Sequence, residues 1–234
     1  QRYSDRSLSS KEQAQVREYL QARERQQGDV YAYNFSGRAR DLANERQRLG
    51  IPDDRRVITI FTNLIWDAAN VSRDVAFDSA LECVTSTMEY FHERDDVHVV
   101  LRSHPAEKVL GTSDRYADRI LQHFDGDLPA NASLIAPEDD VNSFTMIDLT
   151  DIGVVNTSTV GLEMAAMSKP VVLIAETHYR GKGFTYDVES RQEYFTTIER
   201  LICSTEPLPS QVSLAEKYFY MMMFLYQRQL PTRY

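Results

Sequence analysis

Cysteine, long apolar runs and basic charge are all scarce in this chain of 234 residues. The two cysteines, Cys83 and Cys203, stand far apart and lack metal-ligand spacing. We therefore expect buried, reduced thiols in a cytoplasmic protein rather than a disulfide framework or a zinc site. A signal peptide and an apolar run of about 18 residues are both missing, so no membrane-spanning helix is expected.

The balance of charge is acidic, with a net charge of −9 and an isoelectric point near 5.1. This argues against general binding of nucleic acid, which needs a basic surface, but leaves room for a local basic pocket. No Asp-x-Asp pair stands where a metal would be expected, and Asp95-Asp96 and Asp139-Asp140 look like surface turns. The sequence therefore predicts no metal site and no cofactor.

Residues 1–54 contain helical patterns and no pattern typical of a strand. Ser9 and Glu12 form a capping box that opens a polar helix to about Gln26, and a second helix is expected over residues 37–49. We interpret residues 1–54 as a helical extension or linker. Because the chain begins with Gln1, we also expect it to be a piece of a longer protein.

From residue 55 onward, apolar runs alternate with helical patterns. The strands are expected at residues 57–61, 97–101, 133–136, 152–155 and 171–175, and the helices at about residues 73–94, 115–124, 142–149, 160–167, 190–203 and 209–227. Strands that alternate with helices through short loops predict an α/β fold with a doubly wound parallel sheet. The loops that follow the strands should then meet at one edge, where such sheets bind ligands.

The most informative segment is the turn Asn156-Thr157-Ser158-Thr159, between an apolar run and a helix of small residues. We call this segment the hydroxyl turn. Three hydroxyls and unpaired backbone N–H groups at a helix N-terminus suit a phosphate or a carboxylate. The alternative is a simple helix cap, which needs only one hydroxyl and contributes about 1 kcal/mol. Because three hydroxyls stand in a row, we favour anion binding.

Two further loops of the same predicted edge carry polar residues. Arg102 and His104-Pro105 follow the second strand, where the imidazole can donate a hydrogen bond to a phosphate and Pro105 holds the turn. For Arg102, a solvated charge at the sheet edge is the alternative to ligand binding. The loop after the first strand carries Asn63 and Asp67, which should face the same cleft.

Other candidate residues lie further along the chain. After the fifth strand, two glycines alternate with Arg180 and Lys182, whose cations could hold phosphate while the glycines allow a close approach of the backbone. A flexible surface turn is the alternative. Glu163 stands one turn into the helix after the hydroxyl turn and could accept hydrogen bonds from ribose hydroxyls or a base amine. Compensation of the helix dipole is its alternative role.

His104-Pro105 and Thr157-Ser158-Thr159 together resemble motifs of the GT-B glycosyltransferases that make bacterial capsule polysaccharides, including the Kdo transferases and, more distantly, the polysialyltransferases. In that group both motifs are thought to hold the nucleotide phosphate of the donor. The segment His178–Thr185 also resembles a Tyr…Gly-Leu/Phe-Thr segment of capsule synthesis proteins, so the resemblance covers about residues 55–187. It implies that residues 55–234 form a Rossmann-like nucleotide-sugar-binding domain with a C-terminal helix.

A complete GT-B enzyme has two such domains, and the acceptor domain usually supplies the catalytic base. Only one domain is visible here, so the resemblance implies the carboxyl-terminal, donor-binding half, with an N-terminal acceptor domain missing. The implied partners are a CMP- or UDP-linked sugar and a saccharide acceptor. Asp67 is the candidate base, while His104, Ser158, Thr159 and Lys182 would stabilise the charge of the leaving phosphate.

Three other functions remain open at this point. A hydrolysing UDP-N-acetylglucosamine 2-epimerase also uses a His-Pro and a Ser-rich turn, although Gly-Lys-Gly-Phe-Thr fits it poorly. A CDP-glycerol polyol-phosphate transferase of the teichoic-acid type is a further GT-B possibility. The alternative without catalysis is a nucleotide-sugar-binding or scaffold domain.

The last predicted helix carries an apolar run from Lys217 to Tyr226. Packing against the core or the missing domain is the favoured interpretation. The alternative is peripheral contact with the inner face of a membrane, for which only Lys217 and Arg228 provide a basic flank.

Overall fold

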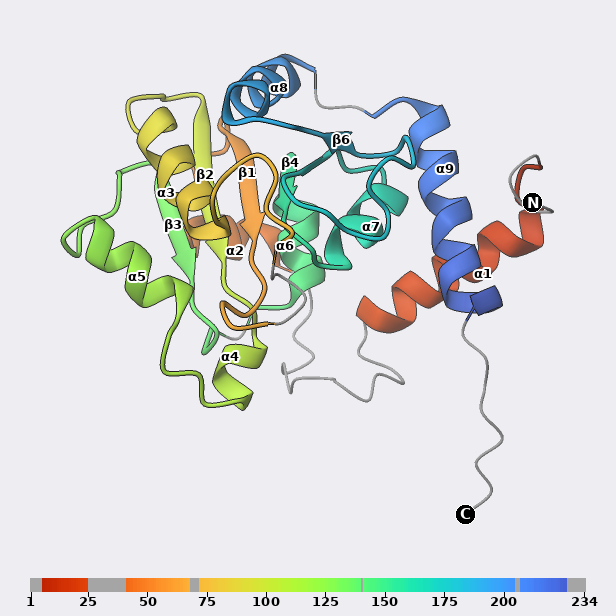
Figure 1. Ribbon diagram of the computed structural model, residues 1–234, viewed down its shortest axis with the longest axis horizontal. Coiled ribbons are helices and arrows are strands. Elements are labelled where there is room, and N and C mark those ends of the chain that lie inside the picture. The colour runs from red at the N-terminus through yellow and green to blue at the C-terminus, as the bar shows by residue number, and fades with distance from the viewer. Residues whose placement is uncertain (1–5, 25–40, 68–71, 140, 205–206, 227–234) are drawn as a thin grey trace.

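The computed structural model describes residues 6–24, 41–67, 72–139, 141–204 and 207–226. Its centre is one six-stranded sheet with helices on both faces (Figure 1). The strands are β1 (Arg56–Phe61), β2 (Val97–Arg102), β3 (Ala132–Ile135), β4 (Ile152–Val155), β5 (Val171–Leu173) and β6 (Tyr186–Asp187). Their order is β3-β2-β1-β4-β5-β6, and every neighbouring pair is parallel. The predicted doubly wound parallel sheet is confirmed.

The helices divide between the two faces of the sheet. They are α1 (Ser10–Glu24), α2 (Leu42–Arg48), α3 (Ala80–Phe91), α4 (Ala106–Val109), α5 (Tyr116–His123), α6 (Ser143–Leu149), α7 (Val160–Ala166), α8 (Arg191–Cys203) and α9 (Pro209–Tyr220), which continues as the π-helix η2 (Met221–Tyr226). One hydrophobic cluster joins the sheet to α1, α6, α7 and α9, and the other joins it to α3, α5 and α8.

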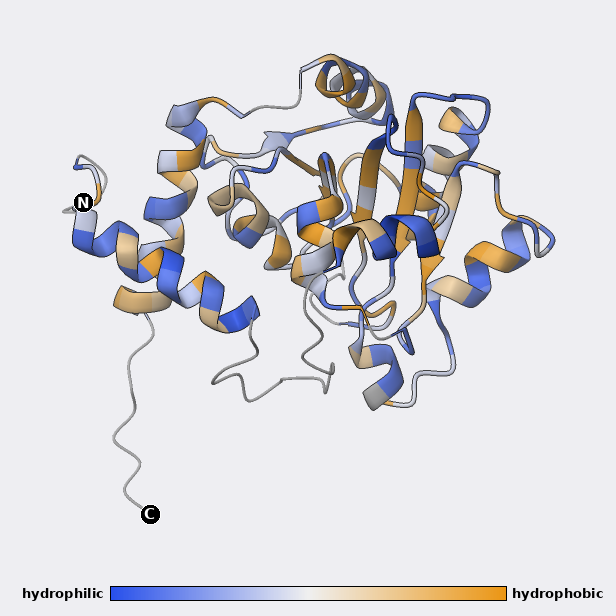
Figure 2. Cartoon of the chain, turned by 180° about the vertical axis from the view of Figure 1, so that it is seen from behind, coloured by the Kyte–Doolittle hydropathy of each residue, from blue (hydrophilic) through white to orange (hydrophobic). Residues whose placement is uncertain are grey.

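The strands are apolar on both sides because both faces are covered. In β1, Val57 and Phe61 belong to one cluster, while Ile58 and Ile60 belong to the other. All four side chains are at most 5% exposed, as expected for a parallel sheet between two helical layers. Figure 2 shows the hydrophobic residues concentrated in the strands, with polar residues on the outer sides of the helices.

The predicted boundaries differ from the structure at several elements. α3 begins at Ala80 rather than near Arg73, because the Ser79 side chain caps it and the preceding loop is held by an isolated antiparallel bridge between Asp74 and Ala175. The sixth strand was not predicted, since two residues are too few to give an apolar pattern. The expected start of the second helix, residues 37–40, lies outside the described residues, and α2 runs from Leu42 to Arg48.

The N-terminal extension is packed on the sheet domain. Val16 and Leu20 of α1 are buried in the same cluster as α7 and α9. The Tyr19 ring meets the Phe219 ring of α9 edge to face, with 5.6 Å between the centroids. The expectation of two buried thiols is wrong for Cys203, which is exposed at the last residue of α8, whereas Cys83 is buried.

Candidate functional site

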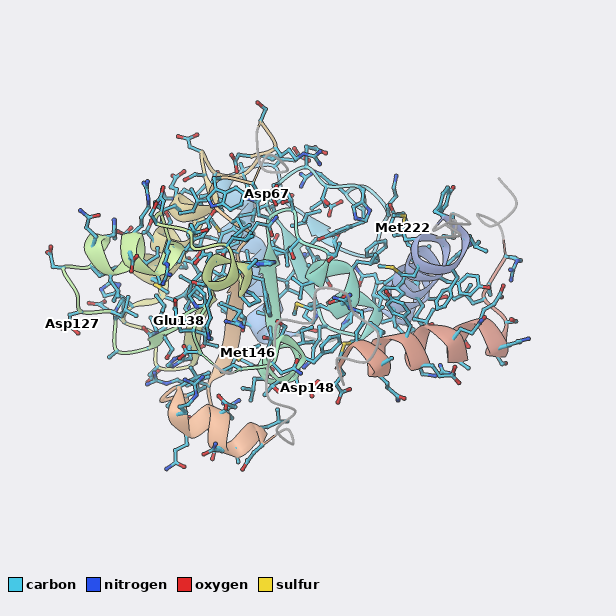
Figure 3. The ribbon with its side chains drawn as sticks, turned by 90° about the horizontal axis from the view of Figure 1, so that it is seen from below. Asp67, Asp127, Glu138, Met146, Asp148 and Met222 are labelled. Atoms are coloured by element: carbon cyan, nitrogen blue, oxygen red, sulfur yellow. The ribbon has the colours of Figure 1, made fainter. Side chains whose placement is uncertain are left out.

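The loops expected to meet at the carboxyl edge of the sheet do come together there. β1 lies between β2 and β4, and Phe61 is in register with both Arg102 and Val155, so the three strands end at the same level. The Asn63 side-chain amide donates a hydrogen bond to the Thr157 hydroxyl, which joins the loops after β1 and β4. Figure 3 looks onto this edge and shows Asp67 on the α3 side of the sheet.

The hydroxyl turn is more than a helix cap. Thr159 is the N-cap of α7, but its backbone is helical and its side chain makes no capping hydrogen bond. Ser158 Oγ accepts only a long hydrogen bond, 3.4 Å, from the Val160 N–H. Thr157 is bonded to Asn63, and Thr159 is exposed. Capping therefore does not account for the three hydroxyls, and their contact with a ligand stays a prediction.

His104 is presented as a hydrogen-bond donor. Its Nδ1 accepts a hydrogen bond from the Ala106 N–H at 3.1 Å, which assigns the proton of the neutral ring to Nε2. Burial lowers the pKa of His104, and the Arg102 guanidinium lowers it further, while the Asp67 carboxylate acts in the opposite direction. The two predicted catalytic residues thus lie near enough to interact electrostatically, with the imidazole neutral near pH 7.

Arg102 stabilises a loop instead of facing solvent. Its side chain is 1% exposed, and it donates hydrogen bonds to the carbonyls of Ala136 at 3.2 Å and Val141 at 3.1 Å. Burial lowers the pKa of Arg102 to about 10. The alternative of a solvated edge charge is therefore wrong. Direct ligand contact would need accessible surface that this guanidinium does not have, so it positions the loop after β3.

Arg180 likewise holds its own loop. The side chain is 7% exposed, and Nη2 donates to the Val188 carbonyl at 2.9 Å and to the Glu189 carboxylate at 2.7 Å. Gly181 and Gly183 have φ of +72° and +83°, so this turn needs glycine for its own conformation. Lys182 is exposed between them. Only Lys182 of the two predicted cations is therefore accessible for a phosphate.

Glu163 faces the N-terminal helix. Its carboxylate lies 2.8 Å from Arg23 Nε of α1, and its side chain is 6% exposed. The ion pair links α7 to α1 across the cluster that also contains Val16 and Leu20. Neither alternative predicted from the sequence included this partner, because a contact between two segments so far apart in the chain has no local signal.

Glu107 is a buried acid near the site that the sequence did not reveal. It stands one turn after His104, in α4, and is 0% exposed. Neither carboxyl oxygen has a hydrogen-bond partner that meets ordinary geometry within the described part of the chain. Burial raises the pKa of Glu107 to about 7, against the lowering effects of the Tyr116 N–H and of Arg115.

A pH dependence of stability follows from Glu107. Its pKa is about 7 in the folded protein and 4.5 in the unfolded chain, so its contribution is complete below pH 4.5 and is lost as the pH rises through 7. We expect Glu107→Gln to stabilise the protein at about pH 8, by on the order of 1–3 kcal/mol, and to matter little at about pH 4.5. Urea unfolding at both pH values measures this. The exposed Glu93→Gln is the matched control, and identical pH profiles for wild type and Glu107→Gln would contradict the expectation.

The Tyr179 side chain holds the hydroxyl turn through a hydrogen bond to its backbone. This fully buried side chain donates a hydrogen bond from its hydroxyl to the Ser158 carbonyl at 2.6 Å. A Cβ atom at Gly161 would lie 2.5 Å from the same hydroxyl and 3.2 Å from Tyr179 Cζ. Glycine at this position therefore lets the tyrosine reach the turn, which is a requirement of packing rather than of backbone conformation.

This contact predicts non-additive effects on stability. Gly161→Ala should cost about 1–2 kcal/mol, because overpacking outweighs the gain in helix propensity. Tyr179→Phe should cost about 1 kcal/mol through the lost hydrogen bond. The double variant should lose less than the sum, because the colliding hydroxyl is gone. A double-mutant cycle by urea unfolding measures the coupling, and strict additivity would disprove the collision.

The described residues contain neither a candidate metal cluster nor a candidate membrane-spanning helix. Within them, no group of three or more His, Cys, Asp or Glu side chains is arranged to hold a metal ion. None of the helices seen in the described ranges combines the length and apolar character needed to cross a bilayer.

The family of the chain follows from its sequence as a whole. Residues 11–200 match the family model described as capsule polysaccharide biosynthesis protein. Because the match covers most of the chain, this protein belongs to that family. The prediction made from His104-Pro105 and the hydroxyl turn is confirmed at this level. No curated protein matches the chain significantly.

Several solved structures match the chain at low sequence identity. Thermosulfurimonas dismutans KpsC, a beta Kdo 2,7 transferase, is 17% identical with a TM-score of 0.47, covering 90% of this chain and 54% of its own. UDP-GlcNAc 2-epimerase from Neisseria meningitidis bound to UDP-GlcNAc is 16% identical with a TM-score of 0.51, covering 77% and 48%. The wall teichoic acid polymerase TagF is 14% identical with a TM-score of 0.44, covering 76% and 41%. This chain therefore spans about half the length of these proteins.

Proposed function

We propose that the carboxyl edge of the sheet binds the phosphate of a nucleotide-activated sugar, and that the domain is the donor-binding half of a capsule polysaccharide glycosyltransferase. The observation that carries the proposal is the meeting of the loops after β1 and β4 through Asn63 and Thr157, in a chain of the capsule polysaccharide biosynthesis family. An open parallel sheet binds its ligand where the strand order reverses, which here is between β1 and β4.

The chemistry of the edge supports an anionic ligand. The neutral His104 ring offers an Nε2–H donor, and Ser158 and Thr159 add hydroxyls at the start of α7. Lys182 is the accessible cation of the loop after β5. In transfer, these groups would stabilise the charge that develops on the leaving phosphate, without a metal ion in that role. His104 would act by hydrogen bonding and Asp67 as the base toward the acceptor.

The missing part of the enzyme is also a proposal. The chain spans about half of the Kdo transferase structure, and we assign the other half to an acceptor domain that precedes residue 1 in the full protein. The activity of the 234 residues alone would then be binding of the donor without transfer.

Thermal unfolding with nucleotides tests the binding proposal. CMP is expected to stabilise the chain slightly more than UDP. A nucleotide at 100 times its dissociation constant should add about 2.7 kcal/mol to the free energy of unfolding. CDP and AMP serve as comparison ligands. If no nucleotide shifts the melting temperature at about millimolar concentration, the phosphate site is wrongly assigned.

Incubation with CMP- and UDP-sugars and a capsule-type acceptor tests the half-enzyme proposal, with EDTA and with magnesium. We expect nucleotide binding in both conditions and transfer in neither. Robust transfer would show that the acceptor side is complete, and binding abolished by EDTA would show that a metal is required.

The proposal for localisation is cytoplasmic, with the C-terminal helix near a membrane. Leu225 and Tyr226 at the end of η2 are 37% and 68% exposed, and Lys217 precedes them in α9. Cosedimentation with vesicles that contain anionic lipid measures this. Equal amounts of protein in the pellet with and without vesicles would show that the helix does not bind the membrane and packs only within the full protein.

A further inference from the structure

A polar cavity lies next to the proposed phosphate site. Its volume is about 220 Å³, and it is enclosed by the loop after β1, the first turns of α3 and α5, and the residue that follows β4. Its polar lining consists of Asp74, Ser79, Tyr116, Arg119 and Asn156. This combination of carboxylate, hydroxyl, amide and guanidinium groups can both donate to and accept from a ligand that is rich in hydroxyls.

Asn156 marks the cavity as more than a gap in packing. The residue is 4% exposed, and its Oδ1 is buried with no hydrogen-bond partner among the described residues. A buried carboxamide without a partner costs free energy unless a ligand or water satisfies it. Tyr116, which is 5% exposed, also lines the cavity. The Asn156 carboxamide is therefore available to a ligand in the cavity.

The cavity continues into a longer groove on the surface. A second hollow of about 400 Å³ between α3 and α5 shares Ser79, Leu81 and Arg119 with the cavity. Its other lining residues include Thr85, Gln122 and His123. The inner space suits a single sugar ring, and the outer space suits the sugars that precede it in a chain. A single donor sugar is too small to fill the outer space as well.

The position of the cavity relative to the proposed base also suits the last sugar of a saccharide chain. Ile65 lines the cavity, and Asp67 lies two residues further along the same loop, beside His104. Asn156 precedes Thr157 of the proposed phosphate site directly. The last sugar of a chain held in the cavity would therefore stand between the loop that carries the base and the turn that binds the donor.

We infer that this cavity and groove, on the α3 and α5 side of the carboxyl edge, bind the terminal sugars of the saccharide acceptor. The inference rests on the proposed function for the direction of the reaction. Apart from Asn156, which begins the hydroxyl turn, the lining shares no residue with the proposed phosphate site. The donor half then carries one wall of the acceptor site, and the missing domain need supply only the other.

The chain contains a built-in reporter for this site. Its single tryptophan, Trp66, directly follows Ile65 of the cavity, is 56% exposed, and donates an indole hydrogen bond to the Thr112 hydroxyl at 3.0 Å. The test is a tryptophan-fluorescence titration of the 234-residue chain with Kdo and N-acetylglucosamine oligosaccharides of one, three and six units, confirmed by calorimetry. We expect affinity to rise from one unit to three and then to level off. No binding of either series at about 10 mM would overturn the inference.

Variants separate this site from the phosphate site. Asn156→Ala should weaken saccharide binding about three- to tenfold, and Gln122→Ala should reduce the gain from one unit to three while it retains affinity for CMP and UDP. Gln192→Ala, an exposed glutamine on α8, is the matched control and should change nothing. Unchanged saccharide affinity in both groove variants would overturn the inference. If the wild-type chain binds saccharide but neither CMP nor UDP, the result contradicts the proposed function alone.

The sugar of the donor is the competing occupant. If it filled the cavity, a nucleotide sugar would bind more tightly than its free nucleotide, Asn156→Ala would remove that difference, and free oligosaccharides would not bind. That pattern would overturn the assignment to the acceptor.

Discussion

Phe219→Ala is expected to lower the free energy of unfolding by about 3–5 kcal/mol. The ring is 0% exposed at the junction of α9 with α1 and α7, and it meets Tyr19 of α1 edge to face. Truncation would leave a cavity at the point that joins the N-terminal helix to the sheet domain. Because a domain is stable by only about 5–15 kcal/mol, this loss should be visible in urea unfolding.

The matched control is Leu214→Ala on the same helix. Leu214 is 41% exposed, so its truncation should cost about 0.5 kcal/mol or less. Similar losses for the two variants would mean that α9 does not anchor α1 as described. Proteolysis near α1 provides a second readout, since Phe219→Ala should expose that helix to cleavage and Leu214→Ala should not.

The second large effect concerns the ligand. His104→Ala and Ser158→Ala should each weaken nucleotide binding by about ten- to hundredfold, because a hydrogen bond to a charged phosphate contributes about 1.5–3 kcal/mol. Isothermal titration with CMP and UDP measures this. Neither change should unfold the protein, since His104 is only partly buried and Ser158 Oγ accepts a single long hydrogen bond.

Two controls make this result specific. Ser204→Ala removes an exposed hydroxyl at the end of α8 and should leave affinity unchanged. His104→Gln keeps an N–H donor at about the distance of Nε2 from the backbone and should retain part of the affinity. Unchanged affinity in His104→Ala and Ser158→Ala would return both residues to structural roles in their turns.

The sheet could be predicted because its information is local. Most of the strands are apolar runs that are buried on both faces, as in β1 and β2, whose twelve positions are buried with the single exception of Arg56. The edge strand β3 is only partly buried. The start of α3 was misplaced because Phe77 continues its apolar spacing, although this ring packs against Tyr194 of α8 from a loop. Side-chain spacing does not distinguish a helix from a loop that packs on the same cluster.

The candidate site was predicted less completely because its contacts are distant in the sequence. The chain shows which loops carry Asn63, His104 and the hydroxyl turn, and topology brings those loops together. It does not show that Arg102 is turned into the protein or that Glu163 pairs with Arg23. Such partners depend on how helices pack over the sheet, which no local pattern encodes. The same holds for the hydroxyl of Tyr179 beneath the turn.

The hydrogen bond from Asn63 to Thr157 spans 94 residues and has a consequence for synthesis on the ribosome. The pair β1–β2 can form once about residue 102 has left the exit tunnel, whereas β4 and the hydroxyl turn follow some 50 residues later. At a translation rate of about 5–20 residues per second, β1 and His104 are made several seconds before β4. During that time, the edge of β1 where β4 will dock is unpaired. A ligand at the proposed phosphate site could not protect this intermediate, because the hydroxyl turn has not yet been made. The exposed edge of β1 is open to pairing with other chains during that interval.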